Sequence, residues 1–404
     1  MAEILYFWII FLDSLRRHVA TKRCLRNFES AHCKGRVEGI SITSRIMQTR
    51  NTLRKLCGAN SRPVVECWLW DSSWLSAIAC DCELFVPGFV KRRKSPVLLY
   101  HDAVFAQHDT GSHPECIARI ERVNAMLDNS GWIARSNCPA WQAASRESIE
   151  RVHKAAYYDQ LKSWCELAAG PIEADTVVSR GSWDAATRAA GAAIDAVQRV
   201  VNGESKRAFC AIRPPGHHAL ADGPMGFCLF NNVAVAAHAA LAAGLHRVMI
   251  IDWDVHHGNG TQDVFYEDGR VAFFSIHRSP FYPGTGKKAE VGTRAGLGWI
   301  ANEPVPEDIT LKDFIDRLTR GIEALATKVR PELILLSAGF DAHRADPVGS
   351  LCLADQDFGT LTRIVTDLAV SHCEGKIVSL LEGGYHLEHL PMSVNAHLEE
   401  LAKS

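Results

Sequence analysis

The chain has little of what marks membrane proteins, disulfide-stabilised proteins or nucleic-acid-binding proteins. The apolar run at residues 4–12 is nine residues long, whereas a helix needs about 20 apolar residues to cross a bilayer. The thirteen cysteines are an odd number without metal-site spacing, which indicates reduced thiols rather than a disulfide framework. The net charge of −2 gives no sign of nucleic-acid binding. We therefore expect a cytoplasmic protein with no membrane or direct nucleic-acid partner, while its oligomeric state stays open.

The first 96 residues differ from the rest of the chain in charge. They contain sixteen Lys and Arg against eight Asp and Glu, although the whole chain has a net charge of −2. An organellar transit peptide would explain the arginines, but acidic residues such as Glu3 and Asp13 count against one. We expect residues 1–96 to form a poorly ordered basic extension and residues 97–404 to form one folded domain.

Short apolar segments alternate with segments of helical periodicity along residues 97–404. The apolar segments have the near-continuous hydrophobicity of strands in a parallel sheet covered on both faces. They lie at 208–212, 248–251, 271–274, 333–336 and 377–381, and the helical segments lie at 232–243, 311–329 and 355–370. The alternation predicts an α/β fold with a single open, mostly parallel sheet and helices on both faces.

The segment 249–260 joins an apolar strand to several carboxylate and imidazole groups. In an extended backbone, alternate side chains point to the same face, so Asp252, Asp254 and His256 are expected to lie together. Burying carboxylates this close to one another without a cation costs several kcal/mol. Because the residues just before them are apolar, the segment predicts a buried metal site.

Polar residues also follow the other apolar segments, in loops at 213–218, 275–277, 337–341 and 382–385. Ligands bind at the carboxyl ends of the strands in open α/β sheets, so these loops are expected to surround one site. A lone histidine is more often a core or surface residue than a ligand. The adjacent His217 and His218, which follow Pro-Pro-Gly at a strand end, are stronger candidates.

From about Val97 to the C-terminus, the sequence resembles the histone deacetylase superfamily, most closely its class II and bacterial deacetylase-like members, which have the arginase-deacetylase fold. The resemblance rests on several motifs in the family's order, and the ordered set is far more specific than any one of them. Ile117 departs from the pattern, because the family has proline there. The motifs are His113-Pro-Glu115 with Arg119, Pro215-Gly-His-His218, Gly226-Phe227, Asp252-x-Asp-x-His-His-Gly-Asn-Gly260, Pro283-Gly-Thr-Gly286, Ser337-Ala-Gly-Phe-Asp341 and Leu381-Glu-Gly-Gly-Tyr385.

The resemblance implies that residues 97–404 are a zinc-dependent deacetylase domain. Asp254, His256 and Asp341 match the family's zinc ligands. Three protein ligands leave a fourth position for water, which is the arrangement of a catalytic zinc site. The ion would polarise an amide carbonyl and lower the pKa of its bound water.

The resemblance also assigns the catalytic groups. His218 is implied to act as general base and then general acid, while His217 contributes mainly through its charge. Asp252 is the implied orienting partner of His217, and Asn259 that of His218. Tyr385 is the implied hydrogen-bond donor to the oxyanion of the tetrahedral intermediate.

The walls of the site and further cations follow from the same resemblance. Gly383 and Gly384 would let the loop before the tyrosine take positive φ and so turn the phenol inward. Gly226, Phe227 and Tyr282 are the implied walls of a narrow substrate tunnel. One structural potassium ion is implied at Asp252, Asp254, His256, Ser275 and Ile276, and a second at Phe265, Asp268 and Val271.

The acetylated substrate, a protein lysine or a small amine, is less defined than the reaction. Family members specialised for acetylpolyamines have a glutamate at the tunnel rim, whereas the matching residue here is Val348. Gly216 is expected to leave the rim open to a peptide backbone. Together these residues favour an acetyl-lysine peptide, or another acetylamide with a neutral stem, over an acetylpolyamine.

Other functional classes compete with the zinc deacetylase. An arginase-like ureohydrolase on the same fold would need a two-manganese cluster, and the tandem histidines and Tyr385 argue against it. A catalytically inactive reader or scaffold would be expected to have lost a zinc ligand or the tyrosine, and the sequence retains them all.

Overall fold

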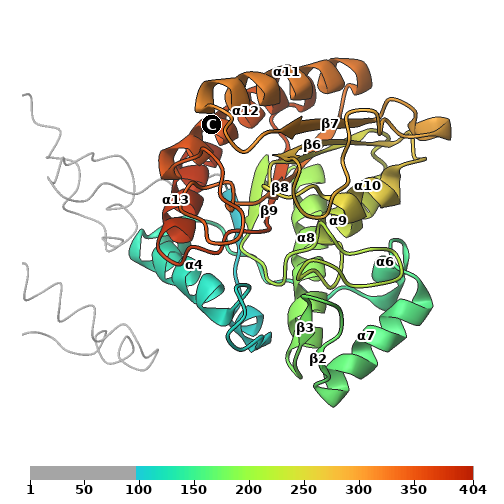
Figure 1. The fold of residues 1–404 in the computed structure, drawn as a ribbon, viewed down its shortest axis with the longest axis vertical. Coiled ribbons are helices and arrows are strands. Elements are labelled where there is room, and N and C mark those ends of the chain that lie inside the picture. Colours follow the sequence, from blue (N-terminus) through green and yellow to red (C-terminus); the bar gives the residue numbers. More distant parts are fainter. Residues whose placement is uncertain (1–96, 404) are drawn as a thin grey trace, which may run out of the picture. The chain divides into compact units, whose positions relative to one another are not determined.

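The computed structural model describes residues 97–403, so the extension expected at residues 1–96 lies outside the described part of the chain. A seven-stranded sheet, parallel throughout, forms the centre of residues 97–403 (Figure 1). In spatial order its strands are β1 (Val97–Tyr100), β4 (Arg207–Cys210), β9 (Ile377–Leu381), β8 (Leu333–Ala338), β5 (Val248–Asp252), β6 (Val271–Arg278) and β7 (Ile300–Val305). The predicted single, mostly parallel sheet is therefore confirmed.

Long helices cover the sheet on both faces. Helices α8 (Ser182–Val201) and α9 (Asn232–Ala242) pack on each other and on the central strands, and α11 (Leu311–Val329) and α12 (Asp355–Cys373) pack on β5, β6, β7 and β8. Helix α13 (His389–Leu401) joins α12 to α4 (Ile117–Asn129). Shorter elements are η2 (Ala103–Gln107), α5 (Trp132–Arg135), α6 (Arg146–Glu150), α7 (Ala155–Leu167), β2 (Gly170–Pro171), β3 (Val177–Val178), α10 (Asn259–Phe265) and η3 (Arg294–Gly296). None of the helices in this part of the chain is long and apolar enough to cross a membrane.

Helix α11 shows how the sequence defines an element. The Thr310 hydroxyl accepts a hydrogen bond from the Asp313 backbone N–H at 3.1 Å and so caps the first turn. Buried residues at three- and four-residue spacing, from Phe314 to Val329, form the face against the sheet. The helix ends where Arg330 adopts a left-handed conformation, so its bounds agree with the predicted segment 311–329.

The strand ends bring the polar loops together. Asp252 at the end of β5 lies beside Ser275 of β6 and Ser337 of β8 in the parallel register. All residues of β5, β8 and β9 are buried, so the polar residues that follow these strands start from a rigid apolar base. The loops after β4, β5, β6, β8 and β9 all contribute to the candidate site.

Candidate functional site

Three buried side chains form a compact group of metal-ligand type beside the ends of β5 and β8. Asp254 and His256 follow β5, and Asp341 follows β8; one ligand atom of each lies within 4.8 Å of the others. His256 Nδ1 is 3.0 Å from Asp254 Oδ1 and 3.2 Å from Asp341 Oδ2. Backbone N–H groups of Val255 and Gly383 donate to Asp341 Oδ1 and Asp254 Oδ2, both at 2.9 Å, which fixes the two carboxylates.

The charge of this group fits a divalent cation. Asp254 and Asp341 are fully buried, and Asp341 Oδ2 accepts no hydrogen bond. Burial, reinforced by the negative charge of Asp254, raises the pKa of Asp341 to about 7. Two carboxylates and one imidazole are a ligand set that zinc accepts, and a cation there would satisfy the oxygen that lacks a donor. The residues expected to hold zinc are therefore together and chemically suitable.

Gly383 serves this group through its small size. A Cβ atom there would overlap the carboxylates of both Asp341 and Asp254. The positive φ expected in this loop occurs at Gly384, with φ 122°, and not at Gly383. Gly383 thus makes room for the carboxylates, whereas Gly384 provides the turn before Tyr385.

The tandem histidines lie next to the group, each with the partner expected from the sequence. His217 Nδ1 is 3.0 Å from Asp252 Oδ2, and His218 Nδ1 is 2.7 Å from Asn259 Oδ1. The two imidazole centroids are 4.0 Å apart. A carboxylate therefore orients one ring and an amide the other, so the two rings have different proton affinities.

The surroundings of the two histidines also shift their pKa values in opposite directions. Burial disfavours protonation of His217, but the charges of Asp254 and Asp252 outweigh it and raise its pKa to about 10. Burial, followed by the positive charges of His217 and His256, lowers the pKa of His218 well below 6.5. At neutral pH, His218 is consequently the neutral ring that can accept a proton.

Glu382 is a buried residue of the site that the sequence did not single out. Its Oε2 accepts hydrogen bonds from the backbone N–H groups of Gly216, at 2.6 Å, and His217, at 3.2 Å. Its Oε1 accepts from the Ser337 hydroxyl at 3.0 Å. One carboxylate thus ties the histidine loop to the end of β8.

The structure corrects the expectation for Gly216. This residue is buried, and a Cβ atom on it would overlap the backbone of Phe230 and Asn232. Gly216 therefore allows close packing behind the tandem histidines and does not open the tunnel rim.

The buried side chain of Arg119 holds the loop that carries Tyr385. Arg119 donates from Nε to the Gly384 carbonyl at 2.5 Å and from Nη2 to the Glu382 carbonyl at 2.7 Å. Its guanidinium carbon lies 4.8 Å from the centroid of the Tyr385 ring. Burial raises the pKa of Tyr385 well above 10, although Arg119 opposes this. The phenol therefore remains a hydrogen-bond donor at neutral pH.

Arg119 is in turn fixed by an ion pair. Glu115 Oε1 accepts hydrogen bonds at 2.7 Å from both Arg119 and Arg213. Burial would raise the pKa of Glu115, but the charges of Arg213 and Arg119 prevail and lower it to about 2. Ile117, which replaces the family's proline, is the first residue of α4, and the helix brings Arg119 to the site.

Asp346 links two walls of the site. Its Oδ1 accepts from the backbone N–H groups of Val348 and Gly349 at 2.9 and 3.0 Å. Its Oδ2 accepts from those of Tyr385 and His386 at 2.7 and 3.2 Å. The side chain therefore fixes the Val348 loop relative to the tyrosine loop.

A cavity of about 180 Å³ is lined in part by His218, by His256 of the ligand group and by Tyr385. Its lining includes every residue that we expected to contact substrate: Gly226, Phe227, Tyr282 and Val348. A Cβ atom at Gly226 would overlap the His218 ring, so glycine is required for this close approach.

Asp175 and Phe281 also line the cavity and were missed by sequence reasoning. Asp175 lies between β2 and β3, where no strand-end pattern points to it. Burial, with Glu173 as the second cause, raises the pKa of Asp175. The cavity therefore has an acidic residue in its wall although position 348 is apolar.

The residues expected to hold potassium lie at the end of β5 and in the loop after it, at the end of α10 and in the loop after it, and within β6. Ser275 forms a hydrogen bond with His277 Nδ1 at 2.9 Å. Asp268 accepts hydrogen bonds at 2.9 and 2.6 Å from Arg270. Phe265 and Val271 lie three residues before and after Asp268 in the sequence. Both potassium sites stay predictions.

Fold and site together define an α/β protein with a metal-ligand group beside the carboxyl ends of its strands. Residues 113–401 match the histone deacetylase domain family. A probable deacetylase from Archaeoglobus fulgidus is 37% identical over 293 residues, which is 72% of this chain and 81% of that protein. A histone deacetylase-like amidohydrolase from Pseudomonas aeruginosa is 37% identical over 292 residues, covering 72% of this chain and 77% of that one.

A solved structure agrees with these relatives. The crystal structure of the HDA15 HD domain superposes with a TM-score of 0.72 at 34% sequence identity, covering 76% of this chain and 88% of that chain. The chain belongs to the histone deacetylase family. Membership supports a hydrolase with deacetylase activity and an acetylated substrate.

Proposed function

We propose that this protein is a zinc-dependent deacetylase that hydrolyses the acetamide of an acetylated lysine side chain. One observation carries the proposal: Asp254, His256 and Asp341 converge beside a cavity whose wall also contains His218 and Tyr385. Bound zinc would supply a Lewis acid for the amide carbonyl and an activated water. The protein's own groups would move the protons and stabilise the oxyanion.

His218 is the proton carrier in this scheme. Its lowered pKa keeps the ring neutral, so Nε2 can accept a proton from the attacking water while Nδ1–H donates to Asn259 Oδ1. The water oxygen bonds to the acetyl carbon to form a tetrahedral intermediate. When the C–N bond then breaks, His218 returns the proton to the departing amine. The products are the free amine and acetic acid, which become the ammonium ion and acetate at neutral pH.

Tyr385 and His217 stabilise the charge that develops. The protonated phenol of Tyr385 donates to the oxyanion, and preorganised donors of this kind contribute about 10²–10³ in rate elsewhere. His217, paired with Asp252, adds positive charge beside the reacting atoms. Because Arg119 and Asp346 fix the tyrosine loop, the donor is oriented before substrate binds.

The shape of the cavity supports a linear acetylated stem. Phe227 lies edge to face with Tyr385 at 5.7 Å between centroids, and Tyr282 lies edge to face with His218 at 5.3 Å. Aromatic walls suit the methylene chain of a lysine side chain. Val348 adds no charge, which supports a neutral stem.

An acetylpolyamine deacetylase is the second candidate function, and Asp175 is the observation that favours it. A carboxylate in the wall of the cavity could pair with the secondary ammonium of a polyamine, and such pairing strengthens where water is partly excluded. Val348, however, offers no charge at the rim position where a glutamate would pair with that ammonium. We therefore place acetyl-lysine peptides first.

Comparison of kcat/KM for an acetyl-lysine peptide and for acetylspermidine tests this order. We expect the peptide to be preferred by more than about tenfold, which is 1.4 kcal/mol. Val348→Glu should shift the ratio toward the polyamine, with Val348→Gln as the uncharged control. A wild-type preference for acetylspermidine that Asp175→Asn removes would reverse the order.

A further inference from the structure

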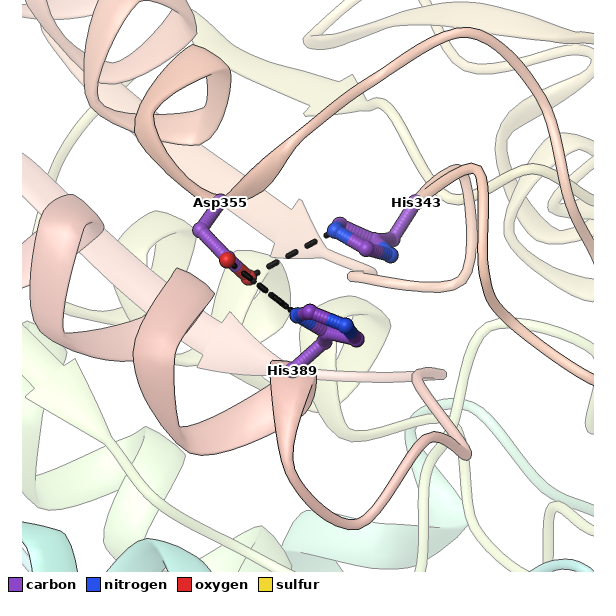
Figure 2. Close-up of side chains that lie close together, drawn as sticks. All are labelled: His343, Asp355 and His389. Carbon is purple, nitrogen blue, oxygen red and sulfur yellow. Dashed lines mark hydrogen bonds and ion pairs between the residues drawn. The ribbon is translucent and has the colours of Figure 1, made fainter.

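A second group of metal-ligand type lies outside the candidate catalytic site. It consists of His343 in the loop after β8, Asp355 at the start of α12 and His389 at the start of α13. Figure 2 shows both imidazole rings with a nitrogen turned toward the Asp355 carboxylate. The two rings are stacked, with centroids 4.3 Å apart and an interplanar angle of 23°. Three segments distant in sequence thus direct ligand atoms at one point.

The spacing of these atoms suits a shared cation better than direct ion pairs. His343 Nε2 is 3.5 Å from Asp355 Oδ1, and His389 Nδ1 is 3.2 Å from both oxygens of Asp355. Charge-assisted hydrogen bonds between nitrogen and oxygen are shorter, about 2.7–2.9 Å. Ligand atoms about 2.0–2.2 Å from a tetrahedral zinc ion are roughly 3.3–3.6 Å from one another. The observed distances lie close to those of a coordination shell.

The surroundings hold the carboxylate in place and leave access to solvent. The Ser393 hydroxyl donates to Asp355 Oδ1 at 3.0 Å. The His343 side chain is 5% exposed, whereas those of Asp355 and His389 are 21% and 32% exposed, so an ion can enter from solvent. His343 Nδ1 accepts a hydrogen bond from the Ala345 N–H at 3.1 Å. Coordination through Nε2 would put the ring proton on Nδ1 and break that bond, which lowers the expected affinity.

We propose that His343, Asp355 and His389 form a second divalent-cation site that takes zinc or a similar borderline transition ion. Two imidazoles and one carboxylate favour such an ion over magnesium or calcium, which prefer ligand sets made of oxygen alone. The ion would join the loop after β8 to the first turns of α12 and α13. His343 is two residues from Asp341, and His389 is four residues from Tyr385, so the ion stabilises the supports of both loops. This site does not depend on the proposed deacetylase reaction.

Zinc content of the full chain tests the site. After incubation with excess zinc and removal of free metal, wild type should hold one equivalent more than His389→Asn or Asp355→Asn. His386→Asn is the matched control: its ring packs on His389 at 4.5 Å between centroids, but its Nδ1 already accepts backbone hydrogen bonds. This control should hold as much zinc as wild type. Equal zinc in wild type, His389→Asn and Asp355→Asn would overturn the proposal.

Thermal unfolding gives a readout in wild type that does not depend on how the variants fold. Zinc added beyond the first equivalent should raise Tm by a few degrees in wild type and His386→Asn, because binding to the folded state alone stabilises it. In His389→Asn this rise should be absent. A Tm of wild type that is insensitive to zinc beyond the first equivalent would contradict the second site, whatever the outcome for the catalytic one.

Discussion

The two groups of metal-ligand type in residues 97–403 contain the same residue types but are built differently. In the candidate catalytic group, which consists of Asp254, His256 and Asp341, both carboxylates are fully buried beside the ends of β5 and β8, and Gly383 leaves room for them. In the second group, Asp355 and His389 begin helices and keep 21% and 32% of their side-chain surface exposed. A buried carboxylate pair needs a compensating positive charge, whereas exposed groups can be hydrated. Burial should therefore make the first group the stronger metal site.

The largest expected effect separates the two groups directly. Asp254→Ala should abolish both deacetylation and zinc binding at the candidate catalytic group. That site has only three protein ligands, so the loss of one should release the ion. Asp355→Ala should keep the catalytic equivalent of zinc. Elemental analysis alongside rate measurements checks both variants. Full zinc in Asp254→Ala would show that the ligand assignment is wrong.

The next effect concerns groups that act on the substrate without binding the metal. His218→Ala and Tyr385→Phe should each lower kcat by a factor on the order of 10² or more with zinc retained, since both act mainly in the transition state. His217→Ala should have a milder effect, because its contribution is electrostatic. Equal and small losses for all three would leave the inactive-scaffold alternative ahead.

A smaller effect should appear in the pH dependence. The pKa of His218 lies well below 6.5, so its neutral, active form persists until the pH falls through that lowered value. Replacing its amide partner through Asn259→Asp places a negative charge at Nδ1 and should raise this pKa. The acidic limb of the kcat profile should consequently move to higher pH. Asn259→Gln is the uncharged control, and an unmoved limb in Asn259→Asp would exclude His218 as the titrating base.

Much of the candidate site could be predicted because its parts are local in sequence. Asp252, Asp254 and His256 follow one apolar strand, and the tandem histidines follow another. The sheet rule that places strand ends together then supplies the remaining proximity. The predicted helix 311–329 agreed with the structure for a similar reason, since its periodicity and its cap are both local.

The supports of the site could not be predicted, because they depend on contacts between distant segments. Asp346 binds the backbone 39 residues away at Tyr385, and Glu382 binds it 166 residues away at Gly216. No pattern in the sequence near Asp346 or Glu382 indicates either contact. The error at Gly216 has the same origin, since whether a glycine opens a rim or allows close packing depends on distant atoms. Strand β7 was missed because it lies at the sheet edge, alternates in burial and contains Pro304.

The second group of metal-ligand type could not be predicted from the sequence either. His343, Asp355 and His389 are separated by twelve and thirty-four residues, with no strand-end pattern common to all three. Only the fold brings them together, through the packing of α12 on α13. Spacing in sequence thus detects a metal site when one loop supplies most of the ligands, and fails when each ligand comes from a different element.

Zinc titration of the metal-stripped full chain tests the central claim most directly. Deacetylation of an acetyl-lysine peptide is followed while metal is removed by a chelator and then restored in measured amounts. The account predicts that the rate falls to background on stripping and returns in proportion to added zinc until one equivalent per chain is bound. A full rate in the stripped protein, or recovery with two equivalents of manganese but not with zinc, would contradict it.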